Sequence, residues 1–503
     1  MKRWGAPILF ILLVATFLVP WLAFVLRFPA DSVIFKDEPW HANILLRLLH
    51  QPKTGLADII FANPDYPPLY YLLAFAAAKG TGDDGRLGLA LPNLLCFLAL
   101  LAMAFHLTLQ RLPAGRAWLA GFLVGLTTFY WSFSITTEMT LAVTVGLFLY
   151  LLLRRDQSPW TPVWLGLAGG LALLAKQTTP LYLAGAVLFY SWEKWRPSLG
   201  LARAATRLAV VGLVAAAVAG AVFYHRGDVF LVLGPRIARG SLYHTIDKGA
   251  VARLLFYPRY AAPQLGFLVL ALLGWRRKRP DAAAGALLVT VLLATVALSL
   301  YSSKFPEYIM PAAFPLALLF VWSLGDESAL SPAIRAAVAL SLVPPLLVLA
   351  GWLQWRFVHV AWEARSVGEV SSLIRAQNDP ATPLPTLSLG SGMWQYRLEN
   401  VFRREAKTER LPVTSVRLAD LSRPDMARFL LFREMPGVDP AADCGTAAEL
   451  RFVLNRRDWP PCDDCLPRLA AMLQTVNREY RARQSGRMGG EAFWTLCERP
   501  DRE

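Results

Sequence analysis

Two adjacent carboxylates, Asp37 and Glu38, follow the first long apolar segment of the chain, and His41 comes shortly after them. The stretch 39–50 that they introduce has its apolar residues at helical spacing. Acidic residues at a helix start can simply cap it. Carboxylates beside a membrane are costly to desolvate, however, which favours a chemical role such as proton abstraction. The same three side chains could also bind a divalent metal.

Three more charged residues, Glu138, Lys176 and Lys304, stand at the ends of later apolar segments. Each has an ordinary interpretation on its own, because a carboxylate suits a helix N-terminus and a lysine near a helix end can extend to the interface. Together with the first carboxylates they predict a cavity for an anionic ligand, in which the two lysines bind phosphate.

Aromatic and acidic residues near these charges complete the predicted cavity. The paired prolines at 67–68 fix the entry to a short helix, and the tyrosines around them suit either an interfacial anchor or a cavity wall. The residues predicted to line the cavity are His41, Asp65, Tyr66, Tyr70, Glu138, Glu307 and Tyr308.

The composition indicates that lipid surrounds much of the chain. Its 503 residues are 55% hydrophobic and only 17% charged, whereas soluble domains carry about 25% charge. A soluble enzyme, a disordered tail and a fibrous protein are excluded. Since a span needs about 20 apolar residues, we predict about eleven membrane helices, with a range of roughly ten to thirteen. The segments are 7–27, 87–109, 117–133, 138–153, 162–176, 178–192, 205–223, 260–274, 282–301, 307–324 and 333–353.

The basic residues set the orientation. With the N-terminus in the cytoplasm, the loops that fall inside hold most of the positive charge, as the positive-inside rule requires. They contain Arg111, Arg116, Arg154, Arg155, Lys194, Arg196, Arg203, Arg207, Arg276, Arg277, Lys278 and Arg279. This pattern accounts for the net charge of +15 without nucleic acid as a partner. It also requires 67–79 to be an interfacial or re-entrant helix instead of a span.

The same topology predicts two domains in an inner (plasma) membrane protein. Residues 1–355 form a membrane domain with extracytoplasmic loops at 29–86 and 224–259. Residues 356–503 form a small extracytoplasmic α/β domain, with strands at 428–433 and 493–497 and a helix at 466–483.

Four of the five cysteines lie in this C-terminal domain, and the fifth, Cys96, lies inside a predicted span. An even number of cysteines in an oxidising compartment favours disulfides. A Cys-x-x-Cys pair with two further cysteines could instead bind zinc. Disulfides are the expectation for Cys444, Cys462, Cys465 and Cys497.

The ordered set of motifs resembles the GT-C glycosyltransferase superfamily, and within it the branch of protein O-mannosyltransferases and lipid A aminoarabinose transferases. The resemblance covers roughly residues 1–325. It rests on Asp37-Glu38 before an interfacial helix, on Tyr-Pro-Pro-Leu-Tyr-Tyr at 66–71, on 170–178 around Lys176, and on the Lys-Phe-Pro-Glu-Tyr run that opens 304–319.

The resemblance implies a hexosyl- or pentosyltransferase that takes its sugar from a polyprenyl-phosphate donor. Asp37 would be the base that activates the acceptor, with Glu38 as the neighbouring acid and Glu138 as an acid of the second outer loop. Lys304 and Lys176 would lie near the donor phosphate. Direct displacement at the anomeric carbon needs no metal, because a lipid phosphate leaves instead of a nucleotide. The acceptor could be a lipid, a glycan or a protein.

A transporter or flippase of lipid-linked glycans is the alternative function. Such proteins place charges at the membrane midplane and often contain inverted repeats. In this sequence the informative charges lie at the predicted outer boundary and no clear repeat is visible. A scaffold function would leave the acidic first loop without an explanation.

Overall fold

The computed structural model describes the membrane-domain helices and parts of the C-terminal region, and every structural statement below concerns these residues. They are 5–27, 38–63, 66–154, 158–223, 281–300, 310–324, 367–368, 371–372, 376, 386–388, 399–404, 413–414, 429–433, 444, 474, 478–488 and 492–498.

The chain divides into two compact units. The helical unit comprises Met1–Val25, Leu56–Ala77 and Ala90–Gly351, and the mixed unit comprises Leu26–Gly55, Ala78–Leu89 and Trp352–Glu503. One boundary therefore lies near the predicted one at 355, but much of the first loop belongs to the same unit as the C-terminal region.

Long apolar helices make up the helical unit. Within the described residues, four helices are long and apolar enough to cross a membrane, namely Gly5–Leu26, Arg86–Leu109, Leu201–Phe223 and Ala282–Ser299, and three shorter ones are also apolar. Many large apolar side chains on them are exposed, among them Val19 and Leu213. Exposure of so many large apolar side chains is unfavourable in water but is expected where the helices are surrounded by lipid.

The helices follow the predicted apolar segments closely. They are α1 (Gly5–Arg27), α5 (Arg86–Leu109), α6 (Ala114–Thr128), α7 (Glu138–Leu153), α8 (Thr161–Ala175), α9 (Pro180–Tyr190), α11 (Leu201–Phe223), α16 (Ala282–Leu300) and α17 (Ala313–Ser323), with a 3-10 turn η1 (Phe129–Phe133), a π turn η2 (Ser191–Trp195) and a short α10 (Arg196–Leu199). The predicted spans 260–274 and 333–353 lie outside the described residues, so the count of about eleven remains a prediction.

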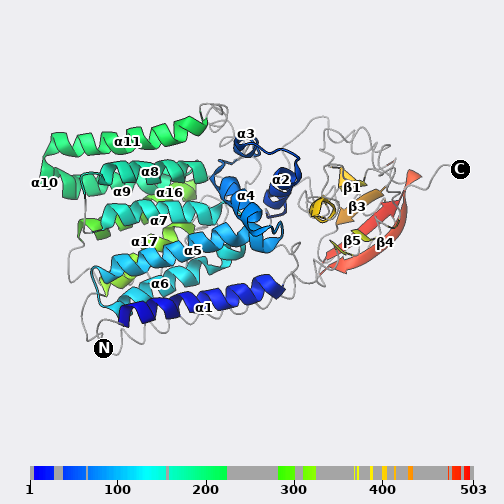
Figure 1. Cartoon of the computed structure of the whole chain (residues 1–503), viewed down its shortest axis with the longest axis horizontal. Coiled ribbons are helices and arrows are strands. Elements are labelled where there is room, and N and C mark those ends of the chain that lie inside the picture. The colour runs from blue at the N-terminus through cyan, green and yellow to red at the C-terminus, as the bar shows by residue number, and fades with distance from the viewer. Residues whose placement is uncertain are drawn as a thin grey trace. The chain divides into compact units, whose positions relative to one another are not determined.

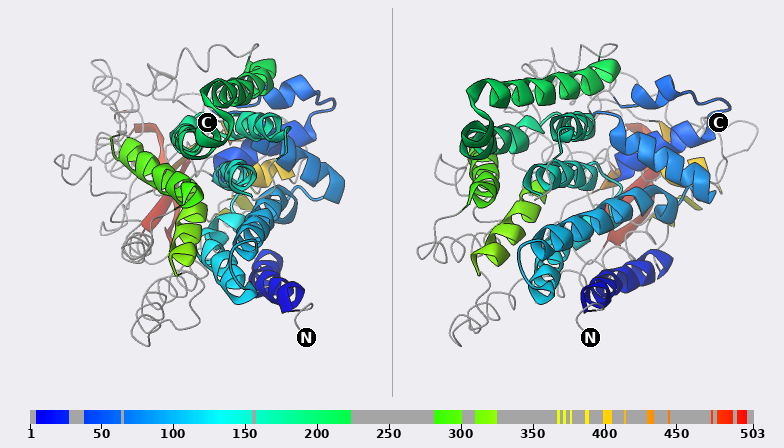
Figure 2. Two further views of the ribbon diagram at one scale, coloured as in Figure 1. Left: turned by 90° about the vertical axis from the view of Figure 1, so that its left-hand side faces the viewer. Right: turned by 60° about the vertical axis from the view of Figure 1, so that its left-hand side comes forward.

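Small residues allow some of these helices to approach closely. Helix α8 contacts both α7 and α11, and α9 contacts α16 (Figure 1, Figure 2). A Cβ at Gly166 of α8 would lie 2.5 Å from the Cβ of Val214 and 2.9 Å from the carbonyl oxygen of Val211 in α11. Glycine at this position therefore permits backbone contact between the two helices, as is common in membrane bundles.

A charged cluster joins three helices at the end that we predict to be cytoplasmic. Arg111, just after α5, donates to Asp281 at 2.6 Å and lies 4.2 Å above the ring of Trp322 in α17. Asp281 also accepts from the backbone N–H of Ala284 at 2.8 Å and so caps α16. Partial burial raises the pKa of Asp281, but the hydrogen bonds from Ala284 and Ala283 and the charge of Arg111 outweigh it, and the pKa is lowered overall.

The first loop contains the helices that the sequence predicted there. Helix α2 (Glu38–His50) matches the predicted stretch 39–50, and α4 (Leu69–Thr81) matches 67–79. A short helix α3 (Leu56–Ile60) lies between them. With 13 residues, α4 is shorter than the roughly 20 residues of a membrane span.

A five-stranded sheet of order β2-β1-β3-β5-β4 lies in the mixed unit. The strands are β1 (Thr386–Ser388), β2 (Val413–Thr414), β3 (Phe429–Arg433), β4 (Arg481–Met488) and β5 (Ala492–Glu498). The first three are parallel neighbours, and β5 is antiparallel to both β3 and β4. Strands β3 and β5 confirm the strands predicted at 428–433 and 493–497.

The predicted helix 466–483 is wrong at its end. Helical structure at Arg478 and Glu479 stops before Tyr480, and β4 begins at Arg481. Strand β4 is mostly polar and has no regular alternation of apolar residues that would mark a strand. Its backbone pairing with β5 decides its conformation instead.

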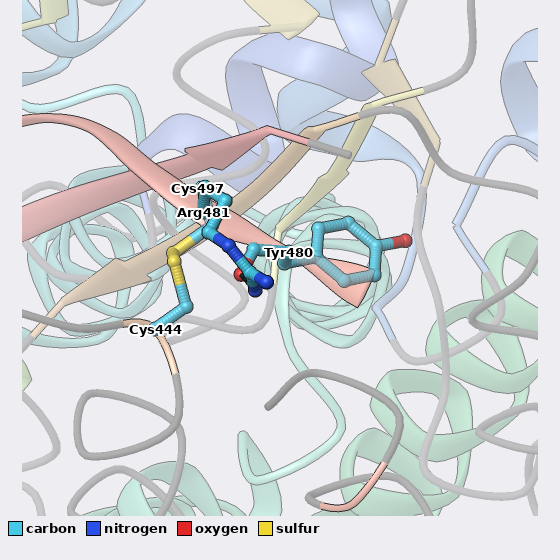
Figure 3. Close-up of a disulfide and its surroundings, with 4 residues drawn as sticks. All are labelled: Cys444, Tyr480, Arg481 and Cys497. Carbon is cyan, nitrogen blue, oxygen red and sulfur yellow. Dashed lines mark hydrogen bonds between the residues drawn. A yellow bond between two sulfur atoms is a disulfide. The ribbon is translucent and has the colours of Figure 1, made fainter. Parts of the chain in front are cut away.

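One of the expected disulfides lies beside this sheet. Cys444 is bonded to Cys497 of β5, next to Tyr480 and Arg481 (Figure 3). Cys462 and Cys465 lie outside the described residues.

Candidate functional site

A buried ion pair joins two of the predicted site residues in the helical unit. The ammonium of Lys176 donates to Oε1 of Glu138 at 2.6 Å. Glu138 is the first residue of α7, and Lys176 directly follows the last residue of α8. The side chains are 9% and 5% exposed, so the pair is shielded from solvent. A phosphate that binds Lys176 must therefore either share the ammonium with Glu138 or displace the Glu138 carboxylate from it.

The ring of Tyr66 lies next to the same ammonium. Lys176 Nζ is 5.3 Å from the ring centroid, within the range of a cation–π interaction. The backbone N–H of Tyr66 donates to the side-chain oxygen of Asn63 at 3.3 Å, and the Asn63 amide donates to the hydroxyl of Tyr71. Asn63 thus ties the turn before α4 to the helix itself and fixes Tyr66. Tyr70, also predicted to line the cavity, is fully buried against Tyr71.

Two residues that the sequence did not single out hold the turn before Glu138. Asn93 of α5, which is fully buried, donates from Nδ2 to the carbonyl oxygens of Ser134 at 2.7 Å and Thr136 at 2.9 Å. Trp21 of α1 donates to the carbonyl oxygen of Ser132 at 3.1 Å. Side chains from two other helices therefore donate to backbone carbonyl oxygens that have no partner within a helix. An asparagine inside an otherwise apolar span was the available signal.

The mixed unit holds a second buried ion pair at the start of α2. Arg86 Nη2 donates to Glu38 Oε2 at 3.2 Å, and the two side chains are 2% and 1% exposed. Arg86 is the first residue of α5, and no pattern in the sequence connected it with Glu38. His41, one turn into α2, is buried beside the ring of Trp40.

Other predicted site residues lie outside the described residues. They are Asp37, Asp65, Lys304, Glu307 and Tyr308. The structure therefore brings together Glu138, Lys176 and Tyr66 in one unit, and places Glu38 and His41 in the other. Among the residues that are described, no cluster of three or more His, Cys, Asp or Glu could hold a metal. The metal set suggested by the sequence includes Asp37, which is not among them.

Comparisons with known proteins bear on the fold. The sequence matches no protein-family profile, and no curated protein is significantly similar to it. Solved structures do match. ArnT from Cupriavidus metallidurans bound to undecaprenyl phosphate is 16% identical, with a TM-score of 0.64 over 97% of both chains. The archaeal oligosaccharyltransferase AglB from Archaeoglobus fulgidus, in complex with an inhibitory peptide and a dolichol-phosphate, is 13% identical, with a TM-score of 0.51 over 95% of this chain and 69% of AglB.

The apo structure of ArnT also matches, with 18% identity and a TM-score of 0.50 over 93% of this chain and 74% of that one. ArnT and AglB are both members of the GT-C superfamily. The resemblance that the sequence motifs indicated is therefore confirmed at the level of the fold, which is a mostly helical membrane fold.

Proposed function

We propose that this chain is a membrane glycosyltransferase that moves a sugar from a polyprenyl-phosphate donor to an extracytoplasmic acceptor. The observation that carries the proposal is the match to ArnT over 97% of both chains, since the ArnT structure holds undecaprenyl phosphate. The motifs at 37–38, 66–71, 170–178 and 304–319 support it independently, because they occur in the order and topology of that superfamily.

In the proposed reaction an acceptor oxygen attacks the anomeric carbon of the donor sugar. The bond between that carbon and the phosphate oxygen breaks, and the polyprenyl phosphate leaves with the electron pair. Asp37 takes the acceptor proton, and Lys304 and Lys176 stabilise the charge of the phosphate. The proximity of Lys176 to Tyr66 and Glu138 supports a role for all three in one cavity wall.

No cofactor is required by this mechanism, because the leaving group is a lipid phosphate. A divalent cation, if one takes part, would be held by Asp37, Glu38 and His41. The transferred group would be a hexose or a pentose, and the acceptor a lipid, a glycan or a protein.

The proposed topology follows the distribution of charge. About eleven helices cross the inner membrane, the N-terminus is cytoplasmic, and the small α/β domain lies on the outer side. The Arg111–Asp281 cluster and the exposed Lys194 would then face the cytoplasm, and Glu138 and Lys176 would face outward.

The test is a transfer assay with the purified protein in liposomes and a panel of radiolabelled polyprenyl-phosphate sugars. Asp37→Asn should lower the transfer rate by about 10³-fold, the middle of the range for a general base. Asp58→Asn is the matched control, because Asp58 is an exposed carboxylate of the same loop and should leave the rate within about twofold.

Two results would contradict the proposal. A wild-type protein that transfers no sugar from any of these donors would exclude the reaction. Transfer by Asp37→Asn at the wild-type rate would exclude Asp37 as the base. If the wild-type protein instead moved the lipid-linked glycan between leaflets, and Asp37→Asn did the same, the flippase function would be favoured.

A further inference from the structure

The C-terminal region contributes a short helical segment, 399–404, that bonds directly to the first-loop helix α2 within the mixed unit. The Asn43 amide of α2 donates to Glu399 Oε2 at 2.9 Å. The Asn400 amide donates to the backbone carbonyl oxygen of Pro39 at 3.0 Å. Both bonds join residues more than 350 positions apart in the chain.

These contacts are shielded from solvent. Asn43, Glu399, Asn400 and Arg403 are all buried, and Glu399 also has Arg403 at 3.9 Å. Hydrogen bonds to a charged group in a buried site are stronger than ordinary surface contacts, and leaving either partner unsatisfied is costly. The segment therefore holds α2 in one orientation.

The same segment also reaches the other side of the first loop. Arg404 donates from Nε to the carbonyl oxygen of Asp84 at 3.4 Å, and the Asp84 carboxylate pairs with His50 at the end of α2 at 2.9 Å. Two residues after Asp84, Arg86 pairs with Glu38 at the start of α2. Both ends of α2 are thus tied, through the loop 84–86, to segment 399–404.

The geometry points to segment 399–404 as a positioning element of the transferase site. Its contacts with Pro39 and Asn43 fix the first two turns of α2, and Asp37 is the residue covalently attached to the first residue of that helix. The C-terminal region would then set the position of the base as well as complete the fold. This inference rests on the proposed function. Glu399 and Asn400 are thus positioning residues: they act on the reaction by holding α2 and do not contact the substrate.

The alternative is that these bonds only stabilise the fold. A stabilising contact changes the amount of folded protein, whereas a positioning contact changes the turnover of each folded molecule. A displacement of about 1 Å at a reacting group can cost about 10²-fold in rate. Turnover measured on the folded fraction alone therefore separates the two roles.

The experiment exchanges the partners of the Asn43–Glu399 bond. Asn43→Asp sets two carboxylates against each other, Glu399→Gln keeps an acceptor for Asn43, and the double variant restores an amide–carboxylate bond with its direction reversed. Each protein is purified as a monodisperse fraction, and kcat and donor KM are measured well below its unfolding temperature. Glu498→Gln is the control, because Glu498 pairs with Arg483 elsewhere in the same unit.

We expect Asn43→Asp to lower kcat by about 10²-fold with donor KM changed by less than about threefold. Glu399→Gln, the double variant and Glu498→Gln should keep kcat within about threefold of wild type. A folded Asn43→Asp protein with wild-type kcat would overturn the inference, and so would a double variant that regains stability without regaining kcat. If Asn43→Asp yields no folded protein, Asn400→Ala, which deletes the bond to Pro39, takes its place, and a folded Asn400→Ala protein with wild-type kcat would overturn the inference.

Failure of the proposed function gives a different result. In that case the wild-type protein shows no transfer, and no ratio between variants can be formed. Loss of kcat in Asn43→Asp against an active wild type thus concerns the positioning role alone.

Discussion

The buried pair of Glu138 and Lys176 allows stability and donor binding to be separated by mutation. Lys176→Met and Glu138→Gln each remove one charge and leave the other buried, and the double variant removes both. With the two side chains 5% and 9% exposed, solvent can do little to compensate for a lost partner.

The geometry sets the expected magnitude. At 2.6 Å and an effective dielectric constant of about 20, Coulomb's law gives about 6 kcal/mol for the attraction between the two charges. The desolvation of both groups offsets much of this in the intact pair. A single variant, however, retains the desolvation of the remaining charge without its partner, so each should lose about 3–5 kcal/mol of unfolding free energy. The double variant should lie within about 1 kcal/mol of wild type, because two neutral side chains need no partner charge.

Unfolding in mixed micelles of increasing SDS content, followed by tryptophan fluorescence, measures these free energies. The same proteins are assayed for transfer at a series of donor concentrations. If Lys176 binds the donor phosphate, Lys176→Met and the double variant should both raise donor KM by about tenfold or more, because a charge-assisted bond to phosphate is lost in each. Lys194→Met, at an exposed lysine, is the control and should change neither quantity.

The double variant decides between the two roles of Lys176. Stability that returns while donor KM stays high supports phosphate binding. If stability and donor KM both return to wild-type values, the pair is structural only and the assignment of Lys176 to the donor is refuted. Losses below about 1 kcal/mol in both single variants would refute the argument from burial itself.

Three further predictions concern the fold. Gly166→Ala should destabilise the protein by about 1–3 kcal/mol in the same unfolding assay, because its Cβ would lie 2.5 Å from Val214, whereas Gly212→Ala, with open space around it, should not. Cys444→Ser opens a loop of 53 residues, for which chain entropy predicts a loss of about 4 kcal/mol; mass spectrometry after alkylation should show this disulfide in the wild type. Because the pKa of Asp281 is lowered in the folded protein, its contribution to stability should be present above its ordinary pKa and lost as the pH falls through the lowered value, and Asp281→Asn should abolish that dependence.

The sequence predicted the membrane helices well because their signal is local. A long apolar run must satisfy its own backbone hydrogen bonds in lipid, so α1, α5, α7, α8, α11 and α16 appear close to where hydropathy placed them. The helix end inside 117–133 was harder to predict, because the 3-10 turn η1 continues the same apolar composition. The segment 178–192 ends in the π turn η2, and no residue type at Ser191 marks its backbone geometry. Strand β4 carried no local signal, because its conformation depends on pairing with β5.

Residue type pointed to the buried charges of the candidate site, but it did not reveal how all of them pair. Glu38 and Glu138 stood out because charges are scarce in the chain, and both are buried in ion pairs. Lys176, 38 positions from Glu138, was placed in the same predicted cavity, although a direct ion pair was not expected. Arg86, 48 positions from Glu38, was not singled out at all. The bond from Asn43 to Glu399 joins residues 356 positions apart, and no spacing pattern in the sequence could predict it.

These pairings also bear on how two adjacent carboxylates could divide their work. Glu38 lies in a nearly fully buried ion pair with Arg86, at the start of a helix whose first two turns are bonded again through Pro39 and Asn43. A carboxylate bound in this way is suited to holding the loop, and a residue that must accept a proton from a diffusing acceptor has to be reached by it. We therefore expect the proton to pass to Asp37, while Glu38 anchors the helix that follows. For the proposed transferase, the scarce charges are thus the candidates for the site, and the partner of each charge indicates whether it serves the reaction or the fold.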